Sequence, residues 1–476
     1  MEIRCNQFQE LSKKALKDQN LQQALKNFST LIQENRNSAF SLLDNPEGLR
    51  EQAHTIKKET LERLDEHLEH LEKNVIRLGG RVHWARDAKK ARELIETIAC
   101  DKGVKTVVKG KSMVTEEIAL NQGLIARGIE VSETDLGEFI IQLAEEPPSH
   151  LVGPAIHKTK GQIAELFSEK LGVRLMEDPQ EMTMFARNTL RHKFIQADMG
   201  ITGVNFAVAK TGSIVLLENE GNIRLSTTLP KIHVAIMGIE KVIRNLEDLN
   251  IFLKLLARST TGQKLSSYTS IITGPKRAGE RDGAEEFHLI ILDNGRSKIL
   301  ADEELRETLY CIRCGACLDF CPVYLKIGGH SYGWVYSGPI GSILTPQLIN
   351  RKQAFQLPFA SSLCGACAEV CPVKINIPKI LLALRRRMIE DPQWGKPSSM
   401  AEKAIFTLYA YIMRNKWLYE RISRIARIAQ MPFIKKGILK NLPPPFNRWT
   451  HHHEVVPLEK TFRQQWKEVS NKYEEL

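Results

Sequence analysis

Seven of the nine cysteines stand in two short runs whose spacing is suited to binding metal. The first run is Cys311-Ile-Arg-Cys314-Gly-Ala-Cys317-Leu-Asp-Phe-Cys321-Pro322, or C-x2-C-x2-C-x3-C-P. The second is Cys364-Gly-Ala-Cys367-Ala-Glu-Val-Cys371-Pro372, the same pattern without its first cysteine. Thiolates at this spacing hold cubane iron–sulfur clusters. The two runs therefore predict two clusters that move single electrons.

The cysteine before each proline is expected to reach across to the other cluster, which assigns every ligand. The first [4Fe–4S] cluster is predicted on Cys311, Cys314, Cys317 and Cys371, and the second on Cys321, Cys364 and Cys367. Ser361 stands three residues before Cys364, where the pattern asks for a thiolate. The second site could hold a [3Fe–4S] cluster, or a [4Fe–4S] cluster whose fourth iron takes the Ser361 oxygen, water or a partner's ligand.

Other uses of these cysteines fit the pattern less well. Structural zinc prefers a closed set of four ligands, usually from two CxxC pairs. Disulfides need an oxidising compartment, and the first residues contain no apolar stretch typical of a secretory signal. Cys5 and Cys100 lie outside both runs, and Cys100 ends an apolar helical stretch that predicts a core position.

Length and composition place the chain among multidomain cytoplasmic proteins. The 476 residues are enough for two or three domains, and 42% of them are apolar. The net charge of +11 raises the question of nucleic acid or an anionic membrane. No zinc finger, RNP-type strand or lysine block supports nucleic-acid binding, and no apolar run reaches the length of a membrane span.

Four regions are expected along the chain: a helical segment at 1–75, an α/β domain at 76–300, a helical two-cluster domain at 301–390 and a basic helical segment at 391–476. Leucines at 61, 64, 68 and 71 predict one apolar stripe on a solvated helix, or a short coiled coil. Strands are predicted at 80–85, 104–109 and 129–135, separated by helices, which indicates an open, mostly parallel sheet. Residues 205–218 predict a hairpin that turns at Gly212.

Polar residues follow the predicted strand ends, where open α/β sheets bind ligands. These candidates are Lys109, Lys111, Ser112, Thr115, Glu116, Glu133, Asp135, Glu138, His157, Lys158, Thr202, Gly203, Asn205 and Glu218, with a further polar loop at 260–265. Each of them could equally be an ordinary turn or cap residue. No dinucleotide fingerprint or P-loop follows a strand, so nothing indicates NAD or ATP.

Helices are expected on both sides of the cysteine runs. Residues 303–310 predict a helix that runs into Cys311, and 378–388 predict another, which favours a helical rather than a β-sheet ferredoxin module. The glycine- and aromatic-rich stretch 327–341 is predicted to be a loop that shields the clusters from water. A basic amphipathic helix is expected around 405–427, and the histidines at 451–453 are predicted to be exposed loop.

These features together resemble the lactate-utilisation protein B family. The resemblance rests on the two cysteine runs and on the segments Lys111-Ser-Met-Val-Thr-Glu-Glu, Asp135-Leu-Gly-Glu-Phe-Ile, Pro154-Ala-Ile-His-Lys-Thr and Gly203-Val-Asn-Phe-Ala-Val-Ala-Lys-Thr-Gly-Ser. It implies an α/β domain of the sugar-phosphate isomerase and cyclo-ligase type. It also implies an iron–sulfur subunit that oxidises L-lactate to pyruvate with two companion proteins, A-type and C-type. The family shares the seven-cysteine arrangement, and it implies no catalytic residue for the α/β domain.

We therefore expect an electron-relay subunit rather than a complete enzyme. Three alternatives remain at this point. The α/β domain could itself bind and activate the hydroxy acid, with Lys111 or His157 in the site and the open iron as Lewis acid. The chain could be a peripheral quinone-linked subunit that docks on a membrane through its basic C-terminal helix, or a redox-sensing regulator.

Overall fold

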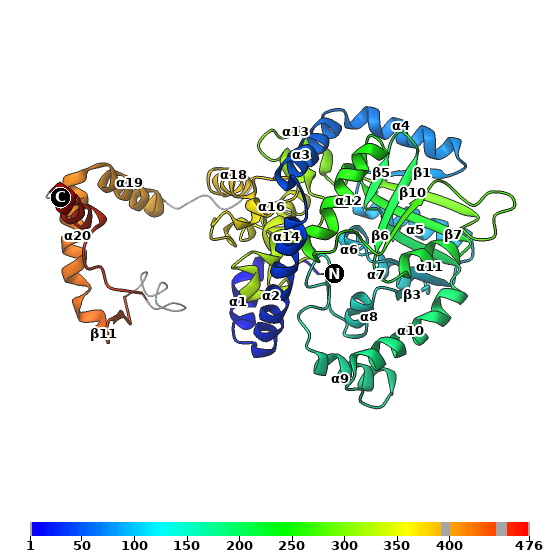
Figure 1. Ribbon diagram of the computed structural model, residues 1–476, viewed down its shortest axis with the longest axis horizontal. Helices are drawn as coiled ribbons and strands as arrows, with labels where there is room; N and C mark the ends of the chain where they lie inside the picture. Colours follow the sequence, from blue (N-terminus) through cyan, green and yellow to red (C-terminus); the bar gives the residue numbers. More distant parts are fainter. Residues whose placement is uncertain (1, 392–399, 444–454, 475–476) are drawn as a thin grey trace. The chain divides into compact units, whose positions relative to one another are not determined.

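The computed structural model describes residues 2–391, 400–443 and 455–474, and the chain divides into two compact units, residues 1–396 and 397–476. The first unit contains a central sheet, a smaller sheet, the N-terminal helices and both cysteine runs (Figure 1). The second unit contains the basic C-terminal helices.

Six parallel strands form the central sheet in the order β1-β10-β7-β4-β2-β3 (Figure 1). They are β1 Arg81–Ala85, β2 Thr106–Lys109, β3 Glu130–Glu133, β4 Met199–Gly203, β7 Ile232–Gly238 and β10 Glu286–Leu292. The predicted parallel α/β sheet is confirmed. Strand β2 lies between β3 and β4, so the chain leaves β2 toward one edge of the sheet and later returns on the other side. Such a switch point opens a crevice at the carboxyl ends of the strands.

A second sheet of four strands, in the order β8-β5-β6-β9, was not expected from the sequence. It comprises β5 Phe206–Val208, β6 Ser213–Glu218, β8 Val242–Ile243 and β9 Tyr268–Ile272. Strands β5 and β6 form the predicted antiparallel hairpin. Gly212 turns it with φ of 70°, and a Cβ there would lie 2.8 Å from the backbone of Asn74. The turn therefore requires glycine.

Helices cover the faces of the central sheet. They are α5 Ala88–Asp101, α6 Met113–Glu117, α7 Leu120–Ala126, α8 Leu136–Leu143, α10 Pro179–Gln196 and α11 Asn222–Thr228. Helix α9 Lys160–Leu171 packs on α8, and α12 Leu246–Thr260 packs on β5 of the second sheet. Asp87 caps α5 by accepting the Lys90 amide at 2.8 Å. Helix α6 starts at Met113, and the Ser112 side chain caps it by accepting the Thr115 amide. Cys100 is exposed rather than in the core, because it follows the buried Ala99 and points to the solvent side of α5.

Four helices form the N-terminal part of the chain, and two of them donate hydrogen bonds to the cluster region. They are α1 Phe8–Ala15, α2 Gln19–Ser41, α3 Pro46–Glu62 and α4 Leu64–Arg77. Arg36 of α2 donates to the Val370 carbonyl at 3.1 Å, and Arg50 of α3 donates to the Cys371 carbonyl at 2.9 Å. The predicted leucine stripe is split between α3 and α4, and all four leucines are buried in the core. The predicted apolar stripe is therefore present, but it lies on two helices rather than one and packs into the core of this chain instead of a coiled coil.

Between residues 293 and 391 the structure consists of helices and loops. The α-helices are α13 Arg296–Ala301, α14 Ala316–Asp319, α15 Tyr324–Ile327, α16 Gly338–Leu348, α17 Ala366–Glu369 and α18 Ile377–Glu390. The helix expected at 303–310 is a 3-10 helix, Arg306–Tyr310. The stretch 327–341 is partly helical rather than all loop, because α16 begins at Gly338. Its aromatic residues Tyr332, Trp334 and Tyr336 are buried.

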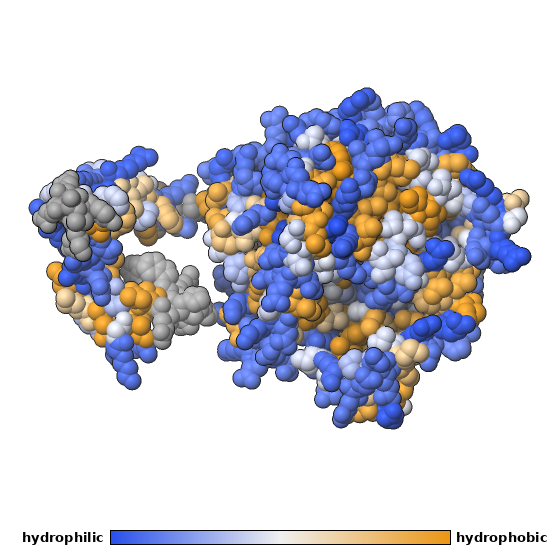
Figure 2. Space-filling model, in the orientation of Figure 1, coloured by the Kyte–Doolittle hydropathy of each residue, from blue (hydrophilic) through white to orange (hydrophobic). Residues whose placement is uncertain are grey.

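The C-terminal unit comprises α19 Met400–Arg414, α20 Lys416–Ala429, β11 Ile434–Lys435, β12 Ile438–Leu439 and α21 Phe462–Glu474. The amphipathic stretch expected to be one helix is therefore two, divided at Asn415, which caps α20. Neither α19 nor α20 has a buried residue, and Figure 2 shows apolar side chains on the surface of this unit. The histidines at 451–453 lie outside the described residues.

Candidate iron–sulfur centre and adjoining pocket

The two cysteine runs share one backbone conformation. Arg313 and Leu363, each one residue before a CxxC cysteine, have φ of 62° and 57°. The glycines that follow those cysteines, Gly315 and Gly365, have φ of 90° and 89°, and each precedes a four-residue helix. Positive φ is costly for arginine and leucine, so its recurrence indicates a shape that ligand positions require.

Four cysteines line one small cavity, which we name the first cluster site. They are Cys311, Cys314, Cys317 and Cys371, the set that the crossing rule assigns together. The rest of the wall is mainly apolar and comes from Leu151, Ile312, Ile340, Val373, Ile375 and Ile377. Sulfur donors in an apolar, water-poor cavity suit an iron–sulfur cluster, whose potential depends on burial.

The remaining three cysteines form what we name the second cluster site. Cys321, Cys364 and Cys367 interact electrostatically with one another. Cys321 and Cys367 are buried, whereas Cys364 is exposed. The second site therefore reaches the protein surface, whereas in the first site Cys317 and Cys371 are buried and Cys311 and Cys314 are half-buried.

Burial raises the pKa of five of these thiols, Cys314, Cys317, Cys321, Cys367 and Cys371. It raises the pKa of Cys367 to about 12 and that of Cys371 to about 11. Burial, and then the neighbouring Cys371 and Cys311, raise the pKa of Cys314 well above its ordinary value. Ligation must therefore displace protons, which needs the positive charge of bound metal.

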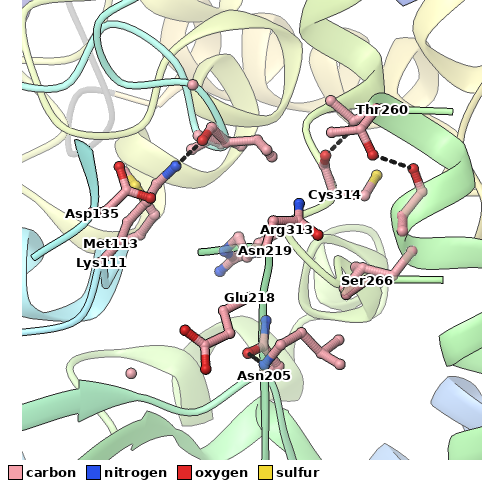
Figure 3. Close-up of a pocket in the computed structure, with 18 of the residues that line it drawn as sticks. Lys111, Met113, Asp135, Asn205, Glu218, Asn219, Thr260, Ser266, Arg313 and Cys314 are labelled. Carbon is pink, nitrogen blue, oxygen red and sulfur yellow. Dashed lines mark hydrogen bonds between the residues drawn. The ribbon is translucent and has the colours of Figure 1, made fainter. Parts of the chain in front are cut away.

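A pocket of about 400 Å³ lies beside the first cluster site, at the carboxyl ends of the sheet strands (Figure 3). Cys314 and Leu151 line both the pocket and the cluster cavity, so they form a shared wall. Thr260, at the end of α12, lines the pocket and donates a hydrogen bond to the Cys314 carbonyl. The volume and the position at the switch point are those of a small-molecule site.

The two ends of this pocket differ in charge. Lys241 and Arg313 line it near the first cluster site, whereas Asp135, Glu218 and Glu220 line it together with a single cation, Lys111, which lies beside Asp135. Burial, and then the nearby Arg313, lower the pKa of Lys241 to about 8. Burial, and then Asp135, raise the pKa of Glu220 to about 7. Both groups can therefore exchange protons near neutral pH.

A buried ion network joins the α/β domain to the cluster region. Arg296 pairs with Glu117 at 2.7 Å and with Glu240 at 2.8 Å, and Arg313 pairs with Glu240 at 3.1 Å. The Tyr336 hydroxyl donates to Glu117 at 2.6 Å. Two guanidinium groups thus balance two carboxylates. Lys241 lies beside this network without a hydrogen bond or an ion pair of its own among the described contacts.

A second buried cluster adjoins the pocket. Lys109 pairs with Glu133 at 2.9 Å and with Glu116 at 3.1 Å, and it donates to Thr115 at 2.9 Å. Although burial alone would lower the pKa of Lys109, these carboxylates and Glu138 raise it. Burial, and then Glu133, raise the pKa of Glu138 well above its usual range.

The structure brings most of the predicted polar residues together. Lys111, Ser112, Asp135, Gly203, Asn205 and Glu218 line the pocket, and Lys109, Thr115, Glu116, Glu133 and Glu138 form the adjoining cluster. Thr202 is buried against His233 at 2.8 Å instead. His157 and Lys158 pair with Glu146 at 2.6 Å and 2.8 Å and do not line the pocket. The expectation that His157 shares a site with Lys111 was therefore wrong.

Sequence reasoning missed the cationic side of the pocket. Lys241 ends a 3-10 helix, Ile239–Lys241, that directly follows β7. No sequence motif marks this helix. Arg313 lies within the first cysteine run, where only the cysteines carried a signal. A search for charged residues inside the metal motif would have found Arg313.

Among the described residues, no helix is long and apolar enough to cross a membrane.

Comparisons with known proteins agree with this architecture. Residues 68–292 match the LUD domain, and residues 307–375 match the 4Fe-4S dicluster domain. A crystal structure of a duf162 family protein from Deinococcus radiodurans aligns with 48% of this chain and 98% of that chain, at 12% identity and a TM-score of 0.26, which is too low to support a structural inference.

Curated relatives match along nearly the whole chain. Lactate utilization protein B of Shouchella clausii is 44% identical over 97% of this chain and 96% of its own length. The proteins of the same name from Bacillus licheniformis and Bacillus thuringiensis are 43% and 44% identical over 99% and 98% of this chain, and 98% of each of their own lengths. The chain therefore belongs to the lactate utilization protein B family, as an iron–sulfur protein with a LUD domain followed by a 4Fe-4S dicluster domain.

Proposed function

We propose that this protein is the iron–sulfur electron-transfer subunit of a complex that oxidises L-lactate to pyruvate. The observation that carries the proposal is the convergence of Cys311, Cys314, Cys317 and Cys371 on one apolar cavity, beside the three-cysteine second site. Lactate oxidation releases two electrons, and two clusters would accept one each. The two sites differ in exposure, which suits a relay from a buried donor side to a surface acceptor side.

The cofactors in this proposal are two [4Fe–4S] clusters. Cys311, Cys314, Cys317 and Cys371 would hold the first, and Cys321, Cys364 and Cys367 would hold the second. When bound, the clusters supply one-electron redox chemistry. The protein shields the first site with apolar side chains and balances its charge with the Arg313 guanidinium, whose pKa is raised by Cys311 despite burial. Reduced thiols of this kind are typical of the cytoplasm.

The partners in this proposal are the A-type and C-type companion proteins. The C-terminal unit supports a docking role, since α19 and α20 expose large apolar residues that include Phe406, Tyr409, Trp417, Ile425 and Ile428. Extended exposed apolar surface is typical of protein interaction sites. Truncation after Asp391 is expected to abolish co-purification with the companions while leaving the iron content of the chain unchanged. Retained co-purification would exclude this surface as the docking site.

The complex can be tested by anaerobic reconstitution. L-lactate added to the three purified proteins should produce pyruvate and the EPR signals of reduced clusters in this chain. Neither should appear when this chain is omitted. Lactate-dependent reduction of a dye at an unchanged rate without this chain would contradict the relay. Stoichiometric zinc in place of iron would contradict it more directly.

The pocket favours a second candidate function, in which the α/β domain itself binds the hydroxy acid. Lys241 is a buried cation without an ion-pair partner, it lines the pocket, and the pocket shares Cys314 with the first cluster site. A buried charge is stable when a counter-ion reaches it. A small carboxylate would provide that counter-ion, while Asn205 and Asn219 offer amide groups to its hydroxyl.

Calorimetric titration of the cluster-loaded chain with L-lactate tests this candidate. Lys241→Met is expected to weaken binding at least about tenfold, since it removes a charge-assisted contact. Lys298→Met, which removes an exposed lysine on α13, should leave binding unchanged. Equal binding by both variants, or no binding by the unmodified chain, would leave the relay as the sole function. Binding of propionate as tight as that of L-lactate would show that the hydroxyl is not recognised.

A further inference from the structure

The backbone shared by the two cysteine runs places Ser361 where the first run has Cys311. Cys311 stands three positions before Cys314, and Ser361 stands three positions before Cys364. Two positions after them, Arg313 and Leu363 both lie in the left-handed region. Four positions after them, Gly315 and Gly365 have nearly the same torsion angles, φ 90° and ψ −16° for the first and φ 89° and ψ −16° for the second. We propose that the Ser361 hydroxyl oxygen is the fourth ligand of the second cluster.

The ligand atoms have matching hydrogen bonds. The Arg313 amide donates to the Cys311 sulfur at 3.4 Å, and the Leu363 amide donates to the Ser361 Oγ at 3.1 Å. In both cases the donor is two residues after the acceptor, and its φ is positive. Amide donors of this kind orient the sulfur ligands of iron–sulfur clusters and tune their potential. The Ser361 Oγ therefore accepts the same kind of backbone hydrogen bond that the Cys311 sulfur accepts.

The backbone at Ser361 is held in place by α18. Arg385 donates from Nη2 to the Ser361 carbonyl and from Nε to the Pro358 carbonyl, both at 2.8 Å. The Ser361 side chain is half-buried, whereas the adjacent Ser362 is exposed. An anchored, partly shielded hydroxyl is suited to ligation because little freedom is lost when it binds.

Ligation needs no oxidant or reductant. The Ser361 Oγ forms a bond to iron, its O–H bond breaks, and the proton passes to solvent, which reaches the site at the exposed Cys364. Oxygen is a harder donor than sulfur and favours the more oxidised iron. The second cluster is therefore expected to have a lower reduction potential than the same cluster with four thiolates.

Three variants test the inference, which rests on the second cluster of the proposed function. Ser361→Ala removes the ligand, Ser361→Cys restores the complete cysteine pattern, and Ser362→Ala is the matched control. Iron and sulfide per chain, EPR spectra and ⁵⁷Fe Mössbauer spectra are measured on full-length protein purified without oxygen. The unmodified chain and Ser362→Ala should contain about eight irons, with one iron whose Mössbauer parameters indicate oxygen ligation.

Ser361→Ala should lose iron selectively, falling to about seven atoms per chain with the oxidised-state EPR signal of a three-iron cluster. Ser361→Cys should keep about eight irons, lose the distinct iron site and raise the potential of the second cluster. Ser361→Ala with unchanged iron and Mössbauer spectra would overturn the inference, as would a three-iron cluster in the unmodified chain. About four irons in every variant would instead contradict the two-cluster proposal itself.

Discussion

The first and second cluster sites have nearly the same local backbone conformation but different surroundings. The first site lies between the α/β domain and the N-terminal helices, shares Cys314 and Leu151 with a polar pocket and adjoins a buried ion network. The second site includes the exposed Cys364 and replaces one cysteine with Ser361. Under the proposed function, similar local backbones would serve as the two ends of one relay, because their surroundings rather than the loops differ.

Substituting the cysteines that are predicted to bind the cluster of the other run should give the largest difference between the two sites. Cys371→Ala lies in the second run but is expected to remove the first cluster, because its sulfur lines the cavity with Cys311, Cys314 and Cys317. Cys321→Ala lies in the first run and should remove the second cluster. Each variant should lose about four irons and one of the two EPR signals. Loss of the first signal in Cys321→Ala, or of the second in Cys371→Ala, would refute the crossed assignment.

The parallel sheet and the meeting of Cys311, Cys314, Cys317 and Cys371 in one cavity were predicted because both depend on local patterns, whereas ligation by these cysteines stays a prediction. Cys311 to Cys371 follow a fixed spacing, and the strands at Thr106 and Glu130 follow apolar runs between helices. The neighbours of the cysteines could not be predicted in the same way. Leu151 reaches the first cluster site, and Lys241 the adjoining pocket, only through the packing of distant segments.

Other errors came from solvent exposure and from long-range pairing. Cys100 belongs to an apolar stretch, but its position on α5 turns it outward, and a one-residue difference from Ala99 decides this. The second sheet pairs β8 with β5 and β9 with β6, strands that are separated by whole helices in the chain. The candidate residues Lys109 and Glu133 were found as separate loop positions. Only the register of β2 with β3, which places them side by side, shows that they form an ion pair.

The ion network should make the first cluster site much more sensitive to mutation than the second. Arg296→Met leaves the buried carboxylates Glu117 and Glu240 without their main cation and is expected to lower the free energy of unfolding by about 3–5 kcal/mol. Arg385→Met, beside the second site, removes two hydrogen bonds to carbonyls and should cost about 1–3 kcal/mol. Urea midpoints measured anaerobically provide the comparison. Equal losses would show that the network does not distinguish the two sites.

The pocket gives the first site a pH dependence that the second lacks, if the hydroxy acid binds there. The pKa of Lys241 is lowered to about 8, so its ammonium group loses its proton as the pH rises through 8. L-lactate affinity should then fall by about tenfold between pH 8 and pH 9.5, and Lys241→Arg should abolish this decrease because guanidinium stays charged. Deprotonation of Glu220, with a pKa of about 7, adds negative charge and should begin to weaken binding at lower pH. A flat titration between pH 8 and 9.5 would exclude Lys241 as the carboxylate ligand.

The smallest expected difference is in the access of solutes to the two clusters. Cys364 is exposed, whereas the first cluster site is walled by apolar residues and covered by α2 and α3. A hydrophilic chelator added to the oxidised protein should therefore remove iron several-fold faster from the second cluster, as followed by the separate decay of the two EPR signals after rapid reduction. Ser361→Cys should slow the loss at the second site and leave the first unchanged, because only the second gains a thiolate. Faster loss from the first cluster would mean that the pocket, through the shared Cys314 wall, opens the first site to solvent more than Cys364 opens the second.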